Sequence, residues 1–196
     1  MTFETSKGRI IPSLEQLRWE KAKLIRRAKW RKAIGSFIAG FSIMLCSGAM
    51  ILVLFLPVLE VSGSSMEPTL KDGDVLLLAH DSNIQSGELC GMYAHDRLIL
   101  KRVIALSGDV VTMDEYGNVF VNNLALNEPY VKEKSLGNCD VTFPFVVPEG
   151  CLFVMGDHRL TSIDSRSSLI GCIEQDQVVG QVVARIWPLN HIGIIN

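Results

Sequence analysis

The stretch RLILKRVIAL, residues 97–106, decides the fold. Successive side chains of a β-strand point to opposite faces, so a strand here has two apolar faces that each carry one cation. The two faces are Ile99, Lys101, Val103 and Ala105, and Leu100, Arg102, Ile104 and Leu106. The stretch therefore predicts a strand that holds two cations among apolar neighbours.

Short apolar runs separated by turn residues continue this pattern on both sides. The turn signals include KDGD, SGD, EYGN and PEG, whose Gly, Asp and Asn residues are typical of connections between antiparallel strands. The further candidate strands are residues 74–80, 109–113, 117–123, 143–148, 151–157 and 178–189. The sequence has no βαβ alternation, no GxGxxG motif, no P-loop and no internal repeat. We therefore expect a mostly β fold with an antiparallel sheet, and a surface loop or lid over residues 127–140, which lack apolar periodicity.

An uncharged run of 27 residues, AIGSFIAGFSIMLCSGAMILVLFLPVL at 33–59, precedes this region. At about 1.5 Å rise per residue, a helix of that length covers a hydrocarbon core of roughly 30 Å. A buried core helix is usually shorter, and the apolar part of a cleaved signal peptide has only about 7 to 15 residues. We expect a single transmembrane helix over 33–59, with those two interpretations as the alternatives.

Charge is distributed unevenly along the chain. Residues 1–32 hold ten Lys or Arg against three Asp or Glu, and the other 164 residues carry a net charge of −9. Basic clusters next to a span remain in the cytoplasm, which predicts a cytoplasmic segment 1–32 and an extracytoplasmic domain 60–196 at the plasma membrane. The basic segment fits either an amphipathic helix on anionic lipid or a solvated tail. The acidity of the outer domain argues against nucleic acid as a partner.

Cysteine and histidine spacing indicates no metal centre. Cys46 lies in the uncharged run, and the other four cysteines lie beyond it, where disulfides are permitted and three complete pairings are open. The sequence has no CxxC pair and no HExxH motif. We therefore expect neither a metal nor a cofactor.

The segment SGSSMEPTL, residues 62–70, offers a serine nucleophile, which needs a base to take its proton. The segment lacks the GxSxG pattern of serine hydrolases that use histidine. Lys101 is the candidate base, because burial disfavours a charged amine and lowers its pKa, whereas the adjacent Arg102 stays protonated. From its strand alone, an edge lysine that reaches solvent is the simpler interpretation of Lys101.

Four stretches in order resemble the type I signal peptidases, membrane-anchored Ser/Lys proteases that remove signal peptides from exported proteins. They are SGSSMEPTL at 62–70, GDVLLL at 73–78, LKRVIALSGD at 100–109 and MGDHRLTSIDSR at 155–166. The resemblance covers most of 62–185 and implies the β fold of the signal peptidase and LexA type, with about 110–150 as a smaller non-catalytic insertion. It places the nucleophile at Ser65 and the general base at Lys101.

The resemblance also implies supporting roles. Ser162 matches a serine that hydrogen-bonds and orients the lysine, and Asp164 with Arg166 matches a paired support beneath the site, for which an ordinary surface ion pair is the alternative. Some members contribute a side-chain hydroxyl to the oxyanion hole at the position of Gly63. Gly63 lacks this hydroxyl, and in this respect the chain resembles the shorter enzymes of Gram-positive bacteria. The supporting residues are Ser162, Asp164, Arg166, Arg102, Gly63 and Asp157. The substrate-pocket residues, each otherwise an ordinary core residue, are Met66, Leu70, Leu76, Ile99 and Leu100.

Three residues depart from the family pattern. His158 and Leu160 stand where the last of the four stretches often has Asn and Asp, and Ser107 replaces a frequent proline. We expect these changes to alter rate or packing more than mechanism.

The resemblance implies cleavage after small residues, commonly alanine, with signal peptides, the lipid bilayer and the protein translocation machinery as partners. A LexA-type self-cleaving repressor is a rival interpretation, but it has a DNA-binding head where this chain has its uncharged run. A peptidase dedicated to pilins or another narrow substrate set is a second rival. A third is a non-catalytic, membrane-anchored β binding or adaptor module, in which Ser65 and Lys101 are incidental.

Overall fold

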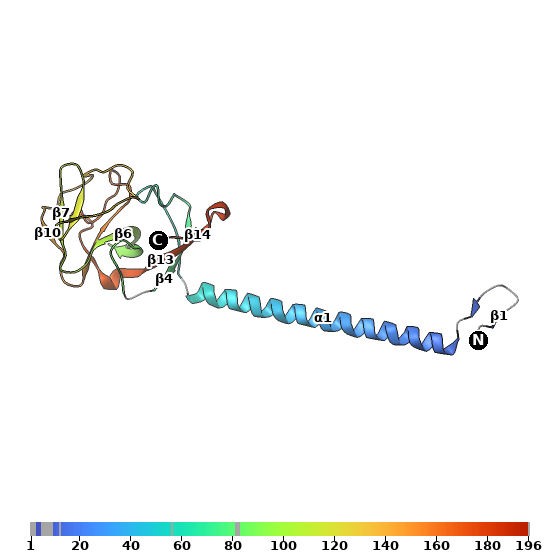
Figure 1. The fold of residues 1–196 in the computed structure, drawn as a ribbon. Helices are drawn as coiled ribbons and strands as arrows, with labels where there is room; N and C mark the ends of the chain where they lie inside the picture. Colours follow the sequence, from blue (N-terminus) through green and yellow to red (C-terminus); the bar gives the residue numbers. More distant parts are fainter. Residues whose placement is uncertain (1–2, 5–9, 12, 56, 81–82, 196) are drawn as a thin grey trace. The chain divides into compact units, whose positions relative to one another are not determined.

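The computed structural model describes residues 3–4, 10–11, 13–55, 57–80 and 83–195, and it divides into two units, Met1–Leu52 and Val53–Asn196 (Figure 1). In the first unit, β1 (Phe3–Glu4) pairs with β2 (Ile10–Ile11), and α1 (Leu14–Phe55) follows. Ser13 and Gln16 begin the helix with reciprocal hydrogen bonds between side chain and backbone, at 3.3 and 3.0 Å. This exchange satisfies backbone N–H groups that the first helical turn leaves unpaired.

The structure differs from the sequence prediction at both ends of residues 33–59. The helix begins nineteen residues earlier, at Leu14, and ends at Phe55, while Val58–Glu60 form strand β3. Pro57 explains the early end, because proline has no N–H for the helix and restricts the residue before it. In the part of the chain that the structure describes, no helix combines the length and hydropathy needed to cross a membrane, so the predicted span is not found.

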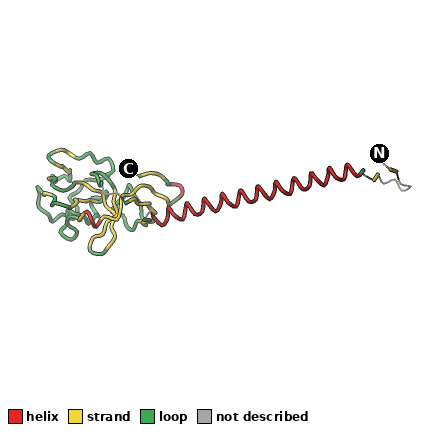
Figure 2. The backbone as a smooth tube through the Cα atoms, turned by 90° about the horizontal axis from the view of Figure 1, so that it is seen from below, coloured by secondary structure: helices red, strands yellow, loops and turns green. Residues whose placement is uncertain are grey.

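The second unit is dominated by antiparallel strands and loops (Figure 2). Its larger sheet has the order β12-β11-β6-β5-β13-β4-β3, with β14 also paired to β13. The strands are β3, β4 (Val75–Ala79), β5 (Leu89–Ala94), β6 (Arg97–Ala105), β11 (Cys151–Met155), β12 (Ile173–Glu174), β13 (Val178–Trp187) and β14 (Gly193–Ile194). The predicted antiparallel β fold is confirmed.

A smaller sheet, in the order β10-β7-β8-β9, falls in the segment expected to be an insertion. Its strands are β7 (Val110–Met113), β8 (Val119–Val121), β9 (Leu124–Ala125) and β10 (Phe145–Val146). One buried apolar cluster joins the two sheets, since Ile104 of β6 and Phe153 of β11 pack in it with Val111 and Val119. That this segment takes no part in catalysis stays a prediction.

The hairpin of β5 and β6 sets the position of β6, the strand predicted at 97–106. Ala94 pairs with Arg97 and Cys90 with Lys101, across a two-residue turn in which His95 and Asp96 both have positive φ, at 48° and 59°. Positive φ at both central residues gives the twist that such short hairpins require. A Cβ at Gly91 of β5 would lie 2.7 Å from Leu78 Cδ2 of β4, so a larger residue there would require the Leu78 side chain to shift.

Candidate active site

The two residues predicted as nucleophile and base lie in hydrogen-bond contact. The Lys101 Nζ atom donates to Ser65 Oγ at 2.9 Å, although 36 residues separate them in the sequence. Lys101 comes from β6 and is only 5% exposed, while Ser65 lies on the turn after β3 and is half-buried. The alternative of a lysine that reaches solvent is therefore wrong.

Burial also changes the proton affinity of this amine. Loss of hydration is the largest cause and lowers the pKa of Lys101 below its ordinary value of 10.5. The negative charges of Asp164 and Asp157 oppose this change, and the positive charge of Arg166 adds to it. The site thus favours a neutral amine next to a serine hydroxyl.

The turn that carries Ser65 is held from both sides. Gly63, with φ +88°, donates its N–H to the Asp72 carboxylate at 2.7 Å. Met66 is buried in the core, and its carbonyl oxygen accepts the Leu70 N–H at 3.0 Å. These contacts leave Ser65 at the surface of a turn that is anchored in apolar packing.

The backbone N–H of the nucleophile is a free donor. Gly63 has no side chain to contribute, and the adjacent Ser64 is exposed. Among the described residues no acceptor takes the Ser65 backbone N–H. This N–H is thus a donor available for negative charge that develops next to Ser65 Oγ.

Gly156 lets a second segment approach this turn closely. A Cβ at this position would lie 2.6 Å from the Ser65 carbonyl oxygen, 2.6 Å from Ser162 Cβ and in collision with Ser162 Oγ. The following His158 donates its N–H to that same Ser65 carbonyl at 3.0 Å. Glycine at 156 therefore allows the nucleophile turn to pack against the residues that support the lysine.

We expect Gly156→Ala to destabilise the fold by about 1–3 kcal/mol, the usual range for overpacking, and to reduce peptidase activity because the Ser65 turn must shift. Gly193→Ala is the matched control, since a Cβ there meets nothing within 4 Å. Thermal melting and a cleavage assay on both variants check this expectation. A Gly156→Ala enzyme that melts and cleaves like the Gly193→Ala enzyme contradicts it.

Asp164 and Arg166 form a wholly buried pair, not an exposed turn ion pair. Arg166 Nε and Nη2 donate to the two Asp164 carboxylate oxygens at 2.8 and 2.9 Å, and the Gly156 N–H adds a bond at 2.9 Å. Burial alone raises the pKa of Asp164, but the hydrogen bonds and charge of Arg166 outweigh it and hold that pKa below its usual value. The ionised pair stabilises the segment 156–166, whose Asp164 charge acts on Lys101.

The prediction for Ser162 needs correction. Its side chain is buried, but Ser162 Oγ has no hydrogen-bond partner of good geometry in the described part of the chain and so does not hold Lys101 as expected. The hydroxyl is nevertheless among the groups that lower the pKa of Asp164. Its close approach to Gly156 makes it a packing neighbour of the nucleophile turn.

Arg102 and Asp157 form a second buried pair, on the opposite face of β6 from Lys101. Arg102 Nε and Nη2 donate to the Asp157 carboxylate at 2.9 and 2.8 Å, and Arg102 Nη1 donates to the Gly87 carbonyl at 2.7 Å. Thr69, three residues after Met66, donates to Asp157 at 2.5 Å. Asp157 therefore connects the strand of the base to the turn of the nucleophile.

The segment 127–140 contacts the arginines of both buried pairs. The Tyr130 ring stacks under the Arg102 guanidinium at 3.9 Å, and Glu128 accepts from the buried Arg159 at 2.5 Å. Arg166 Nη1 donates to the Ser135 and Leu136 carbonyls. The segment is a loop, as predicted, but sequence reasoning missed Glu128, Tyr130 and Thr69, because only the fold brings them to their partners.

A groove of about 140 Å³ leads to Ser65 and Lys101. Three of the predicted pocket residues line it, namely Met66, Ile99 and Leu100, together with Leu59–Ser62 and Leu98. Leu70 and Leu76 do not line it: both are fully buried in the core with Met66 and Leu100, so their assignment to the pocket is wrong. The groove runs between β3 and the first half of β6.

The described residues contain no group of three or more His, Cys, Asp or Glu side chains that could hold a metal ion. The five cysteines are free thiols, and burial raises the pKa of Cys90 to about 12.

Comparison with known proteins identifies the family of the chain. The family model described as "Signal peptidase, peptidase S26" matches residues 33–187. The chain is 36% identical to Signal peptidase I of Bacillus caldolyticus over 68% of its own length and 80% of the relative's. It is 32% identical to Signal peptidase IB of Staphylococcus aureus (strain N315), covering 80% of this chain and 88% of the relative. The crystal structure of a signal peptidase I from Enterococcus faecalis V583 aligns with 26% identity and a TM-score of 0.42, over 50% of this chain and 96% of that one. The chain therefore belongs to the signal peptidase family, peptidase S26, a family of serine endopeptidases.

Proposed function

We propose that this protein removes signal peptides from exported preproteins, with Ser65 as the nucleophile and Lys101 as the general base. The observation that carries the proposal is the 2.9 Å contact between a buried lysine amine and a serine hydroxyl at the end of a groove. Membership of the signal peptidase family supports the substrate class.

The reaction needs only groups that the site provides. A neutral Lys101 amine takes the proton of the Ser65 hydroxyl while Ser65 Oγ attacks the scissile carbonyl. The resulting ammonium gives its proton to the leaving amine, and the signal peptide stays attached to Ser65 as an ester. Lys101, neutral again, then removes a proton from water, which attacks the ester carbonyl. As the ester bond breaks, Lys101 returns that proton to Ser65 Oγ, and the signal peptide leaves with a free carboxylate.

The Ser65 backbone N–H is the proposed donor to the oxyanion that forms on the scissile carbonyl. The loss of one such donor usually costs about 10²–10³ in rate, so a site without a hydroxyl at Gly63 depends strongly on this N–H.

The substrate is proposed to bind as an extended strand in the groove. β3 is the edge strand of the larger sheet, and β6 pairs with β11 only through residues 102–105, so Arg97–Lys101 leave one edge without a strand partner in the described part of the chain. An extended peptide can use such free backbone groups, with its alternate side chains in shallow pockets. Met66, Ile99 and Leu100 line the floor near Ser65, where small side chains fit.

Cleavage of a preprotein with an Ala-x-Ala site by the detergent-purified chain tests this proposal, with the new N-terminus sequenced. Cutting directly after the final alanine by the wild type, and not by Ser65→Ala, supports it. If folded protein leaves this preprotein intact while a control peptidase cuts it, general signal peptide removal is ruled out, and a narrow-substrate peptidase or a binding module is favoured.

The lowered pKa of Lys101 predicts a distinctive pH profile. Because the neutral amine is the active form, kcat/KM rises with pH as Lys101 loses its proton, and the midpoint lies below the ordinary lysine value of 10.5. Measurement of kcat/KM from acidic to alkaline pH, with melting curves to exclude unfolding, checks this. A rising limb at the ordinary value for lysine contradicts a buried amine as the base.

Location at a bilayer is proposed from the sequence of residues 33–59 and their basic neighbours. The full chain is then expected in the membrane fraction of expressing cells and is expected to resist alkaline carbonate extraction. Recovery in the soluble fraction contradicts this location.

A further inference from the structure

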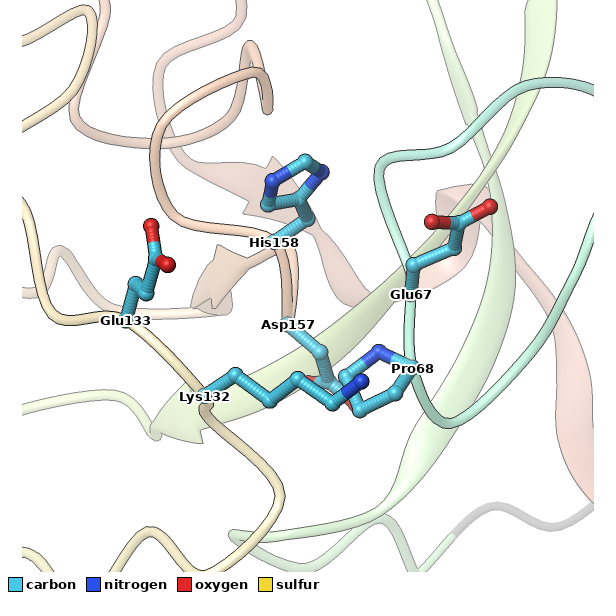
Figure 3. Close-up of a pocket in the computed structure, with 6 residues that line it drawn as sticks. All are labelled: Glu67, Pro68, Lys132, Glu133, Asp157 and His158. Atoms are coloured by element: carbon cyan, nitrogen blue, oxygen red, sulfur yellow. The ribbon is translucent and has the colours of Figure 1, made fainter.

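A second cavity is lined in part by Glu67 and Pro68 of the nucleophile turn. It has a volume of about 140 Å³. Its walls come from the nucleophile turn, the loop 127–140 and the segment after β11 (Figure 3). The lining residues are Glu67, Pro68, Lys132, Glu133, Asp157 and His158. We call this cavity the mature-side pocket.

The mature-side pocket begins where the groove ends. Ser65 and Met66 line the groove, and the next two residues, Glu67 and Pro68, line the pocket. His158 binds the Ser65 carbonyl through its N–H at 3.0 Å and so fixes the opposite wall beside the nucleophile. The pocket is therefore next to the groove along the chain, on the turn that carries the nucleophile.

Distance limits which substrate residues reach it. Glu67 is two residues from Ser65, so its backbone lies within about 7 Å of the nucleophile, the span of two extended residues. The side chains of the first two residues after the cut are the ones in range.

The unpaired charges of the pocket are mainly acidic. The Asp157 carboxylate is already used by Arg102 and Thr69. Glu67 and Glu133 are exposed, and neither carboxylate forms a hydrogen bond or ion pair with another described residue. Figure 3 shows these two side chains on opposite sides of His158, with Lys132 running below them toward Pro68. Two free carboxylates against one free ammonium leave a rim with net negative charge.

We propose that the mature-side pocket binds one of the first two residues of the released protein and favours a basic side chain over an acidic one there. The inference depends on the proposed function, because it assigns the part of the substrate that follows the cut. It makes Glu67 and Glu133 specificity-determining residues.

The test uses peptides with one Ala-x-Ala site and Lys, Gln or Glu at the first or the second position after the cut. For the wild type at low salt, kcat/KM for the Lys peptide is expected to exceed that for the Glu peptide about threefold to fivefold at one of these positions, the range of an exposed ion pair. The preference should shrink as salt screens the charges. A wild type that cuts the Gln peptide at the expected bond without any preference between Lys and Glu overturns the inference and leaves the proposed function intact.

The double variant Glu67→Gln with Glu133→Gln leaves Lys132 as the free charge of the pocket, so it is expected to lose the preference for Lys and to favour the Glu peptide slightly, while it still cuts the Gln peptide. Glu149→Gln changes the net charge by one unit at an exposed site outside the pocket and should keep the full preference. If the double variant does not fold, Glu133→Gln alone is used, because Glu133 lies on an exposed loop. It leaves one free carboxylate against one free ammonium, so most of the preference should be lost. A preference that survives these changes, or that Glu149→Gln removes equally, overturns the assignment to this pocket.

Discussion

Lys101→Ala is expected to lower kcat/KM for a signal-peptide substrate by about 10³-fold, within the range that a positioned general base contributes. The Ser65 hydroxyl then has no base in contact, because Lys101 Nζ is the side-chain partner that the structure gives to Ser65 Oγ. The fold should persist, since Lys101 forms no ion pair with any residue that the structure describes. Steady-state cleavage rates, together with thermal melting, measure both effects.

Two further variants separate the base from its charge. Lys101→Arg keeps a cation but cannot deprotonate near neutral pH, so it should be as inactive as the alanine variant. Lys71→Ala removes an exposed lysine from the same domain and should cleave at the wild-type rate. An active Lys101→Arg enzyme would show that a positive charge at this position suffices, and the Ser/Lys mechanism would then be wrong.

Asp164→Ala is expected to destabilise the protein by about 3–5 kcal/mol, the usual cost of removing one partner of a buried ion pair. Arg166 has no exposed surface, and two of its three guanidinium nitrogens donate to Asp164. Without the carboxylate, a buried guanidinium keeps only the carbonyl groups of the surrounding loops as acceptors. The free energy of unfolding from denaturant titration of the full chain measures the loss.

Asp176→Ala is the control for this prediction, because Asp176 is an exposed aspartate in a surface turn. Its unfolding free energy should stay within about 0.5 kcal/mol of the wild type, as for most surface substitutions. Equal unfolding free energies of the Asp164→Ala and Asp176→Ala proteins would mean that the buried pair of Asp164 and Arg166 does not stabilise the fold.

The strand at 97–106 was predictable because its apolar residues and its two cations are properties of a short continuous stretch. The pairing of Ser65 with Lys101 was predictable only through the resemblance, since nothing local connects residues 36 positions apart. The same resemblance identified Asp164 and Arg166, but their complete burial depends on the loop at Ser135 and Leu136, which sequence cannot place.

Strand β5 was not predicted, and the reason is physical. Its sequence LCGMYA contains a glycine and lacks β-branched residues, and the turn to β6 uses His95 and Asp96 where Asn-Gly is the usual signal. Pairing with β6 on one side and β13 on the other makes it a strand. Cross-strand context thus overrides local propensity in the centre of the sheet.

The errors over Leu70 and Leu76 have a related cause. Apolar residues near a catalytic serine suit a substrate pocket and a core equally well, and the choice depends on which way each side chain points. Leu76 packs inward from β4, and Leu70 lies beneath the nucleophile turn, so both stabilise the site without lining the groove.

Glu128 and Arg159 show a further limit of sequence reasoning. They are 31 residues apart, in a polar loop and in a turn, and neither segment has a period that indicates burial. The structure buries both side chains as a pair.

The most direct test of the Ser/Lys mechanism is peptide mapping by mass spectrometry after rapid quenching of a reaction with an activated ester of an Ala-x-Ala peptide. Such an ester acylates a nucleophile faster than water removes the product, so a covalent intermediate accumulates in a burst. The mechanism predicts one equivalent of acyl group per enzyme, attached to Ser65 and absent from Ser65→Ala. An acyl group on any other residue, or turnover of the ester by Ser65→Ala at the wild-type rate, would contradict it.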